Sequence, residues 1–261
     1  MDTDIVHRRI EGGVGTLIMD HYAKRNALSE TLTGAMFQVL EDFRARRLRA
    51  VILRAQPGVK IWSSGHDVHE LPHTRRDPLA YNDPLRRIIR QIAEFPAPVI
   101  AMIEGSVWGG GSELALACDI TIAVPETTFA LTPAKLGIPY NVAGLLNFMN
   151  VVPFSLLKEM AFSAQPVSAQ RLADANVLNH LVPAADLESF TMALAKKIAA
   201  NAPLSVTAMK ESLRLLAAAH TMSPAGFERL QSVRRMVWDS KDYIEGIDAF
   251  LEKRPANFTG E

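Results

Sequence analysis

Short apolar runs and stretches of helical periodicity follow one another along the first two-thirds of the chain. Four apolar runs have the length and composition of buried strands: Gly15–Met19, Ala50–Leu53, Val99–Ile103 and Ile120–Val124. Apolar residues at helical spacing predict helices between them, over residues 29–47 and 84–95 and from about residue 110. Strands that alternate with helices usually pair in parallel through right-handed crossovers. The pattern therefore predicts an α/β fold.

The N-terminal segment predicts a hairpin that leads into the first helix. Ile5–Ile10 and Gly15–Met19 form the two predicted strands, joined around Gly12 and Gly13. Ser29 is a predicted N-cap, because its hydroxyl can accept a hydrogen bond from an N–H of the first helical turn. One face of the helix that follows is apolar and should face the core: Leu32, Met36, Val39, Leu40 and Phe43.

The pattern changes at Leu187, after which the chain is almost entirely helical. Four helices are predicted, over residues 187–200, 203–218, 224–238 and 241–253. Pro203 and Pro224 suit the first turns of two of them, where proline costs no hydrogen bond. The chain therefore divides into a predicted α/β core over residues 1–186 and a C-terminal helical region over residues 187–261.

Composition excludes several functional classes. The 261 residues are 48% hydrophobic, enough for a substantial core in one large domain or in a domain with an appendage. The 28 basic and 28 acidic residues cancel, and no basic run favours nucleic acid as a partner. A single cysteine, Cys118, favours a reducing compartment. No stretch approaches the roughly 20 apolar residues that span a bilayer, and residues 1–9 lack the apolar core of a secretory signal. We therefore expect a cytoplasmic protein with no membrane partner.

Two small-residue segments, each after an apolar run, carry most of the chemical information. They are Ser63–Asp67 and Gly109–Glu113. Glycine lets the backbone approach a ligand closely and leaves N–H groups free to point at it. Two N–H donors from separate turns can hold a developing oxyanion. The pair therefore predicts a site that stabilises an enolate.

With Lys24–Leu28 upstream and Ala117–Ile120 downstream, these turns resemble the crotonase (enoyl-CoA hydratase/isomerase) superfamily, from about Ile5 to the C-terminus. Three further stretches, over residues 64–72, 105–110 and 137–141, resemble the branch that decarboxylates alkylmalonyl-CoA esters without biotin. The resemblance implies a spiral of ββα units. It also implies that the C-terminal helices mediate oligomerisation, giving a homotrimer or a dimer of trimers.

The resemblance implies roles for individual residues. The backbone N–H groups of His66 and Gly110 would form the oxyanion hole. Lys24 and Arg25 would meet the nucleotide end of coenzyme A, and the alternative for them is a solvated basic turn. Lys253 would add positive charge at the same end of coenzyme A, either from the same chain or from another subunit. The predicted substrate- and CoA-binding set is Lys24, Arg25, Ala27, Ser64, Gly65, His66, Asp67, Gly109, Gly110 and Lys253.

Glu113 and Ala134 bear on which reaction is catalysed. Hydration of an enoyl thioester calls for carboxyl groups that activate water and deliver a proton. Hydratases of the superfamily usually place a second glutamate after the proline of the segment corresponding to Thr132–Ala134, and here that position is Ala134. Alanine cannot transfer a proton, so the pair is broken. Glu113 is either a chemical participant or a structural carboxylate near a helix start.

Tyr140 and the imidazole of His66 are the remaining candidates for catalysis. In the decarboxylase branch the corresponding tyrosine lies in the active site, where its hydroxyl would bond the thioester oxygen or the carboxylate. The alternative for Tyr140 is simple packing beside Pro139. The His66 ring would orient a substrate carboxylate, and the alternative is a histidine tolerated at a turn.

Two cofactor motifs can be set aside. His66, His69 and the adjacent Glu70 suggest a metal, but neither a third ligand nor a recognisable zinc spacing is evident. Ala208–Glu211 resembles part of a biotin-attachment motif, but Lys210 lies in a helical pattern, whereas biotin lysines sit in a β-hairpin. We expect no metal and no biotin, with coenzyme A entering as part of the substrate.

The function hypothesis is decarboxylation of methylmalonyl-CoA, or of a related 2-alkylmalonyl-CoA, to propionyl-CoA through an enolate. Within the same superfamily, the alternative is an enoyl-CoA hydratase or isomerase that uses Glu113. A third hypothesis belongs to a different class, a non-catalytic subunit that binds acyl-CoA.

Overall fold

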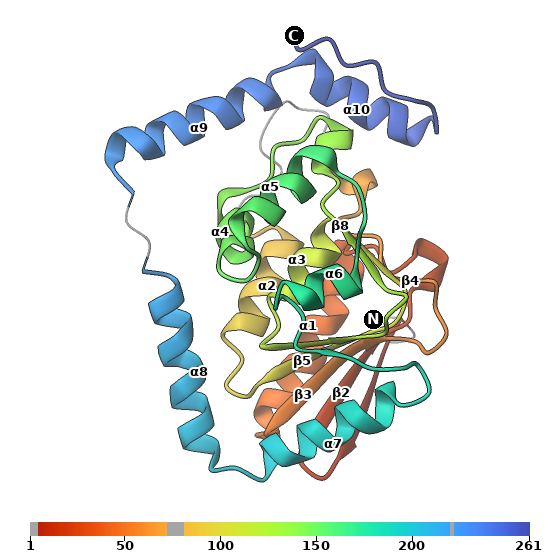
Figure 1. Cartoon of the computed structure of the whole chain (residues 1–261), viewed down its shortest axis with the longest axis vertical. Helices are drawn as coiled ribbons and strands as arrows, with labels where there is room; N and C mark the ends of the chain where they lie inside the picture. Colours follow the sequence, from red (N-terminus) through yellow and green to blue (C-terminus); the bar gives the residue numbers. More distant parts are fainter. Residues whose placement is uncertain (1–4, 72–80, 220–221) are drawn as a thin grey trace.

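The computed structural model describes residues 5–71, 81–219 and 222–261 (Figure 1). Pro72, the last residue of one stretch that carries the family resemblance, lies outside these ranges. The strands are β1 (Val6–Glu11), β2 (Val14–Met19), β3 (Ala50–Ala55), β4 (Ile61–Ser63), β5 (Val99–Ile103), β6 (Ser106–Trp108), β7 (Ile120–Ala123), β8 (Thr128–Ala130), β9 (Val167–Ser168) and β10 (His180–Leu181).

The helices include three short 3-10 segments. The α-helices are α1 (Glu30–Ala45), α2 (Pro84–Ala93), α3 (Gly110–Leu116), α4 (Val142–Met149), α5 (Phe154–Ser163), α6 (Ala169–Asp174), α7 (Leu187–Ala199), α8 (Pro203–Ala217), α9 (Pro224–Trp238) and α10 (Lys241–Leu251). The 3-10 segments are η1 (Tyr22–Lys24), η2 (Val68–Glu70) and η3 (Pro133–Leu136).

The strands form two sheets. The larger has the order β1-β2-β3-β5-β7-β10, and the smaller has the order β4-β6-β8-β9. In the larger sheet, β1 and β2 form the predicted antiparallel hairpin, and the other neighbours pair in parallel. In the smaller sheet, β4 pairs with β6 and β6 with β8 in parallel, while β8 and β9 are antiparallel. The prediction of an α/β fold with parallel crossovers is confirmed.

Helix α1 forms where its apolar face predicts it. The Ser29 hydroxyl accepts a hydrogen bond from the Leu32 N–H at 3.3 Å, as the N-cap prediction requires. Of the predicted core face, Leu32, Met36, Leu40 and Phe43 are buried, and Val39 is half-buried. This face of the helix packs on the larger sheet.

The larger sheet is covered on both faces, which explains why its strands are continuous apolar runs. In β3, Val51 and Leu53 belong to the core beneath α1 and α2. Between them, Ile52 points to the opposite face, where it packs in a second core with Leu187 and Ala195 of α7. Because successive strand residues face opposite sides, both sides of β3 must be apolar.

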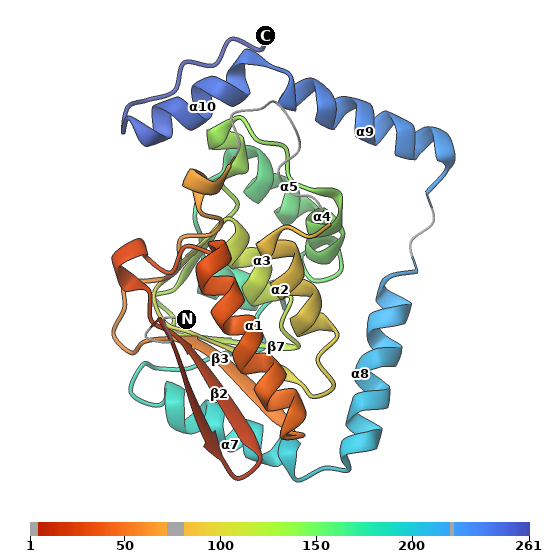
Figure 2. The ribbon, with the colours of Figure 1, turned by 180° about the vertical axis from the view of Figure 1, so that it is seen from behind.

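After α7, helices α8 and α9 run outside the α/β core (Figures 1 and 2). Helix α7 packs against the sheet, whereas α8 has no buried residue and extends along the side of the molecule. Helix α10 returns to pack on η3. The helical character of this region is as predicted, and the division at residue 187 stays a prediction. No helix within the described ranges has the length and apolarity to cross a membrane.

Candidate active site

The two glycine turns meet at one end of the smaller sheet. Strands β4 and β6 are parallel neighbours, so the turns that follow them leave the sheet at the same edge. Gly65 has a φ of +87°, and a Cβ atom there would lie 2.5 Å from the carbonyl oxygen of Trp108. A Cβ atom on Gly110 would lie 3.3 Å from the backbone nitrogen of His66. The backbones approach this closely because both positions are glycine.

The backbone N–H groups of His66 and Gly110 lie beside one another, and neither is used in the backbone hydrogen bonding of the described turns. Gly110 is the first residue of α3, so its N–H has no intrahelical acceptor. No turn or loop hydrogen bond joins either N–H to the backbone of the described residues. Two adjacent donors of this kind can hold one oxygen that gains negative charge.

The turns open into a cavity of about 550 Å³, within the range of small-molecule sites. The predicted site residues that line it are Lys24, Arg25, Ala27, Ser64, His66, Asp67, Gly109, Gly110, Glu113, Tyr140 and Lys253. Gly65 is predicted but does not line the cavity, because it lies behind the turn whose shape it permits. Apolar side chains complete the wall, among them Leu85, Leu136, Trp238 and Phe250.

Cations from opposite ends of the sequence lie on this cavity. Lys24 ends η1, and its Nζ lies 3.5 Å from Oδ2 of Asp67. Lys253 follows α10 and lines the same cavity within the same chain. The neighbouring Arg254 instead pairs with two glutamates outside the cavity lining, Glu245 and Glu252. The fold thus places Lys24 and Lys253, from distant parts of the chain, on the same cavity.

Glu113 is deeply buried in a cluster of polar side chains. Its side chain is 1% exposed and forms an ion pair with Arg86, which is 8% exposed. Nδ2 of Asn147 lies 3.5 Å from its Oε1, while its Oε2 has no hydrogen-bond partner among the described residues. Burial raises the pKa of this carboxyl above its usual value, and Arg86 opposes the rise. Glu113 is therefore held by structural contacts through Oε1, and its Oε2 is buried near Tyr140.

Tyr140 lies against Glu113 and the second glycine turn. Its hydroxyl donates to the carbonyl of Gly109 at 3.5 Å, and its ring packs edge-on to Phe148 with centroids 5.4 Å apart. A Cβ atom on Gly144 would lie 2.6 Å from the ring and 2.8 Å from Oε2 of Glu113. Burial and the nearby Glu113 carboxyl raise the pKa of the Tyr140 phenol well above its usual value. The phenol therefore stays protonated, and because the contact of its one O–H with the Gly109 carbonyl is long, at 3.5 Å, a bound substrate can take the place of that acceptor.

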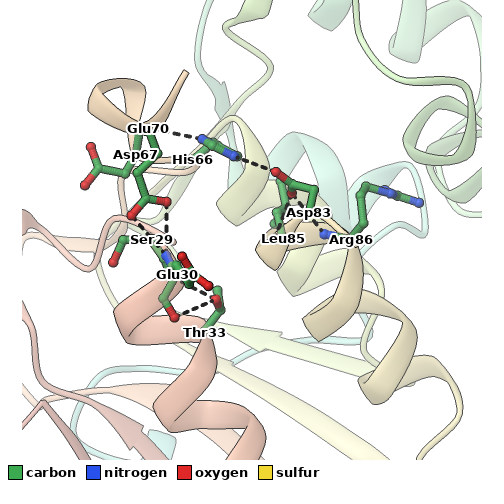
Figure 3. A network of polar contacts seen from close by, with 9 residues as sticks. All are labelled: Ser29, Glu30, Thr33, His66, Asp67, Glu70, Asp83, Leu85 and Arg86. Atoms are coloured by element: carbon green, nitrogen blue, oxygen red, sulfur yellow. Dashed lines mark hydrogen bonds and ion pairs between the residues drawn. The ribbon is translucent and has the colours of Figure 1, made fainter. Parts of the chain in front are cut away.

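The His66 ring has an acceptor at each nitrogen (Figure 3). Its Nδ1 lies 3.0 Å from the carbonyl oxygen of Asp67, and its Nε2 lies 3.3 Å from Oδ2 of Asp83. Burial disfavours a charged ring, but the hydrogen bond and charge of Asp83, the Asp67 carbonyl and the charge of Glu70 together more than offset it, so the pKa of His66 is raised. The side chain is 15% exposed and faces the cavity.

The residues of the two cofactor motifs have other partners. His69 is exposed, and the Glu70 carboxylate accepts hydrogen bonds from the N–H of Glu30 at the start of α1. Within the described ranges, no group of three or more His, Cys, Asp or Glu side chains is placed to hold a metal ion. Lys210 lies in α8 as predicted, and its amine donates to the carbonyls of Ile92 and Ala97 at 3.1 Å each.

The segment that carries a second glutamate in hydratases lies beside the cavity. Thr132 and Pro133 line it, and Ala134 follows them in η3 with an exposed side chain. Among the described lining residues, the carboxyl groups are those of Asp67 and Glu113. Asp67 is already engaged, because it caps η2 through the His69 N–H at 3.1 Å and meets Lys24.

Sequence reasoning missed the side chains that surround the predicted ones. Asp83, Arg86 and Asn147 come from elements flanking the two turns, and no motif marks their roles. Asp83 directly before Pro84 was readable as a helix start, because aspartate is a preferred N-cap and proline suits the first helical turn. Its second contact, to His66, depends on the tertiary fold.

Comparison with known proteins now identifies the family. The model of the enoyl-CoA hydratase/isomerase family matches residues 9–261. The chain belongs to this family. A relative from Escherichia coli (strain K12), named methylmalonyl-CoA decarboxylase, is 47% identical over 247 residues, covering 95% of each chain. The human enoyl-CoA hydratase domain-containing protein 3, mitochondrial, is 31% identical over 93% of this chain and 79% of the relative.

Solved structures of family members have the same fold. A methylmalonyl-CoA decarboxylase in complex with 2-nitronate-propionyl-CoA matches with a TM-score of 0.97 and 45% identity, covering 99% of each chain. A methylmalonyl-CoA decarboxylase complexed with 2S-carboxypropyl CoA matches with the same TM-score and identity over 100% of each chain. An enoyl-CoA hydratase from Mycobacterium avium subsp. paratuberculosis K-10, at 20% identity and a TM-score of 0.80, shows the shared fold alone. The resemblance to the crotonase superfamily, and within it to its decarboxylases, is confirmed.

Proposed function

We propose that this chain is a lyase that decarboxylates methylmalonyl-CoA to propionyl-CoA. The observation that carries the proposal is the content of the cavity: two adjacent backbone donors, the Tyr140 phenol and the His66 ring, with alanine where a hydratase needs its second glutamate. The 47% identity to the Escherichia coli methylmalonyl-CoA decarboxylase over 95% of both chains supports it.

In this proposal, the thioester oxygen lies between the N–H groups of His66 and Gly110. Tyr140, a neutral phenol beside this pair, holds the substrate carboxylate out of the plane of the thioester. That orientation aligns the breaking C–C bond with the carbonyl π system, which is a positioning effect. Each backbone donor contributes about 3 kcal/mol of transition-state stabilisation.

The electrons and the proton then balance as follows. The electron pair of the C–C bond moves into the thioester carbonyl as carbon dioxide leaves, and the enolate oxygen gains the negative charge. A proton added at the α-carbon gives propionyl-CoA. Because the thioester carbonyl is itself the electron sink, the proposed reaction requires neither biotin nor a metal ion.

The nucleotide end of the substrate would meet the cations of the cavity. Lys24, Arg25 and Lys253 line it, and the phosphates of coenzyme A are the anionic groups that they can attract. Since Lys253 reaches this cavity within its own chain, the proposed CoA contact needs no residue from another subunit. A cytoplasmic location stays a prediction, based on the single cysteine.

A homotrimer or dimer of trimers is likewise part of the proposal. Large apolar side chains of α8 are exposed, including Leu204 at 84%, Leu213 at 68% and Leu216 at 73%. Exposed apolar faces of this extent mark interaction surfaces. Light scattering on the purified chain should give three or six copies. Replacing Leu213 and Leu216 by glutamate should lower that number, and a wild-type monomer would contradict the proposal.

Mass spectrometry of separate incubations with methylmalonyl-CoA and crotonyl-CoA tests the reaction directly. We expect propionyl-CoA from the first and no hydrated product from the second. Hydration of crotonyl-CoA that is lost in Glu113→Gln would identify a hydratase instead. Tight binding of CoA esters without turnover of either would identify a non-catalytic binding subunit.

A further inference from the structure

The first turn of α2 contacts three separate parts of the candidate site. Asp83, the N-cap of α2, reaches the His66 ring. Two residues later, Leu85 packs against Gly110. A Cβ atom on Gly110 would lie only 2.7 Å from Cδ2 of Leu85. Arg86 forms the buried ion pair with Glu113. One helix start therefore joins the imidazole, the second oxyanion donor and the buried glutamate.

Asp83 divides its two carboxylate oxygens between helix and ring. Oδ1 accepts from the N–H groups of Leu85 at 2.9 Å and Arg86 at 3.3 Å, which caps α2. Oδ2 faces Nε2 of His66 at 3.3 Å (Figure 3). The Asp83 side chain is 6% exposed. Capping accounts for one oxygen only, so the contact to His66 needs a separate explanation.

The acceptors around the ring assign its charge. At Nδ1 the partner is the carbonyl oxygen of Asp67, which can only accept, so this nitrogen carries a proton. At Nε2 the partner is a carboxylate oxygen, also an acceptor when ionised. A ring with acceptors at both nitrogens holds two protons and is an imidazolium. Since both N–H groups are used, neither remains for a substrate atom.

We propose that Asp83 is a positioning residue that keeps His66 as a fixed imidazolium, so that the pair presents its positive end to the substrate carboxylate. His66 lines the cavity, whereas Asp83 stands behind it. The ring acts through its charge, not as a donor to substrate or as a proton shuttle. This inference rests on the proposed function, because it assigns the site a preference for carboxylated acyl-CoA esters.

Other charges surround the pair and bear on any pH effect. Asp83 approaches the ring from α2, and Glu70 adds negative charge from η2. The Asp67 carboxylate is held by Lys24. The remaining charged or titratable residues of the cavity lining are Arg25, His69, Glu113, Tyr140 and Lys253. Among the described groups, Asp83 provides the ring's direct carboxylate contact.

The variant Asp83→Asn separates charge from capping. Asparagine is as good an N-cap as aspartate, so its oxygen can still accept from the N–H groups of α2. Its amide nitrogen would face Nε2 of His66 as a donor, which favours a neutral ring. Asp83→Ala removes cap and charge together. Asp186→Asn, an exposed acid-to-amide change at the start of α7, is the matched control.

Nuclear magnetic resonance titration of the His66 ring, assigned with His66→Gln, is the first measurement. In the wild type the ring should stay protonated above pH 6.5, the ordinary value for histidine. In Asp83→Asn it should lose its proton at lower pH, and in Asp186→Asn it should not change. An identical His66 titration in wild type and Asp83→Asn would overturn the proposal. This readout needs no substrate and stands even if the proposed reaction fails.

The second measurement is the pH profile of methylmalonyl-CoA decarboxylation. Activity should fall as pH rises through the pKa of His66, and Asp83→Asn should move that fall to lower pH. At neutral pH kcat should drop on the order of 10- to 100-fold, as expected for loss of one nearby charge. The inhibition constant of propionyl-CoA, which lacks the carboxylate, should differ by less than about threefold between the wild type and Asp83→Asn.

Failure of the Asp83 proposal and failure of the proposed function would give different results. An unchanged profile in Asp83→Asn, with loss only in Asp83→Ala, would make Asp83 a helix cap and nothing more. A wild type that yields no propionyl-CoA, yet has a His66 titration that depends on Asp83, would overturn the proposed function and leave the charge assignment intact.

Discussion

Two walls of the same cavity are built on different principles. The backbone wall, residues 65–66 and 109–110, places two N–H groups through chain conformation, with positive φ at Gly65 and Gly109. The side-chain wall consists of His66, Glu113 and Tyr140, and Asp83 and Arg86 stand behind it as partners of His66 and Glu113. It is supported by two ion pairs, the partly buried His66–Asp83 and the buried Arg86–Glu113. The first wall has no titrating group, and the second depends on charge.

This difference predicts different sensitivities. The backbone wall should be insensitive to pH but intolerant of an added Cβ atom, because its donors are peptide groups held by close packing. The side-chain wall should tolerate changes of shape better than changes of charge, because an uncompensated charge in a buried site is costly. Substitutions that alter one wall and leave the other in place can test this separation.

The largest effect is expected from Gly65→Ala. The new Cβ atom would lie 2.5 Å from the Trp108 carbonyl oxygen and 3.0 Å from the Gly110 nitrogen, at a φ of +87°. Because both donors are displaced, kcat/KM with methylmalonyl-CoA should fall by about 10³-fold or more. Gly58→Ala is the control, since Gly58 also has a positive φ, +78°, but has open space around its Cβ position. Activity of Gly65→Ala within tenfold or so of the control would contradict the assignment of this wall.

Tyr140→Phe tests the side-chain wall at its reacting end. The substitution keeps the edge-on packing against Phe148 and removes only the hydroxyl. We expect kcat to fall by about 10²-fold, the effect of losing one placed donor, with little change in propionyl-CoA binding. Tyr22→Phe, at an exposed tyrosine of η1, provides the control. If kcat stays at the wild-type level, Tyr140 serves packing alone.

Glu113→Gln tests the buried charge of the same wall. The substitution leaves Arg86 in a buried site without its counter-charge, so urea unfolding should show a loss of about 3 kcal/mol. The double variant Glu113→Gln with Arg86→Met should lose less than the sum of the single losses, because no unpaired charge remains. Arg171→Met, in an exposed ion pair with Glu159, is the control and should leave the urea midpoint nearly unchanged. Additive losses would show that Arg86 and Glu113 are not coupled.

The same two walls show how far the sequence could predict the site. The backbone wall was predictable because its information is local: glycines follow apolar runs, and a turn constrains its own N–H groups. The larger sheet and the long helices were predictable for the same reason, since the periodicity of α1 or β3 lies within one segment. The structure places the turns of Gly65 and Gly109 together, as the function hypothesis required.

The side-chain wall was predicted only in part, because its contacts join distant segments. Arg86 meets Glu113 across 27 positions of sequence, and Asp83 meets His66 across 17. Nothing near Arg86 marks it as the partner of a glutamate. In the smaller sheet, the sequence indicates a strand at Thr128–Leu131, where β8 lies, but strands such as β4, with 3 residues, are too short for periodicity to identify. Helices α4–α6 were not predicted.

The smallest effect concerns stability against pH and tests the His66–Asp83 pair without substrate. Burial lowers the pKa of His66, but Asp83, the Asp67 carbonyl and Glu70 together outweigh it, so the folded-state pKa is raised above 6.5. A raised pKa means that the folded protein binds the proton more tightly than the unfolded chain does. The stabilisation is therefore complete below pH 6.5 and disappears as pH rises through the folded-state value. The free energy of unfolding of the wild type should fall across this window relative to that of His66→Gln. Urea unfolding at closely spaced pH values measures the difference. If the two stability curves run parallel, the pKa of His66 is the same in the folded and unfolded states, and the contact with Asp83 does not hold the ring as an imidazolium.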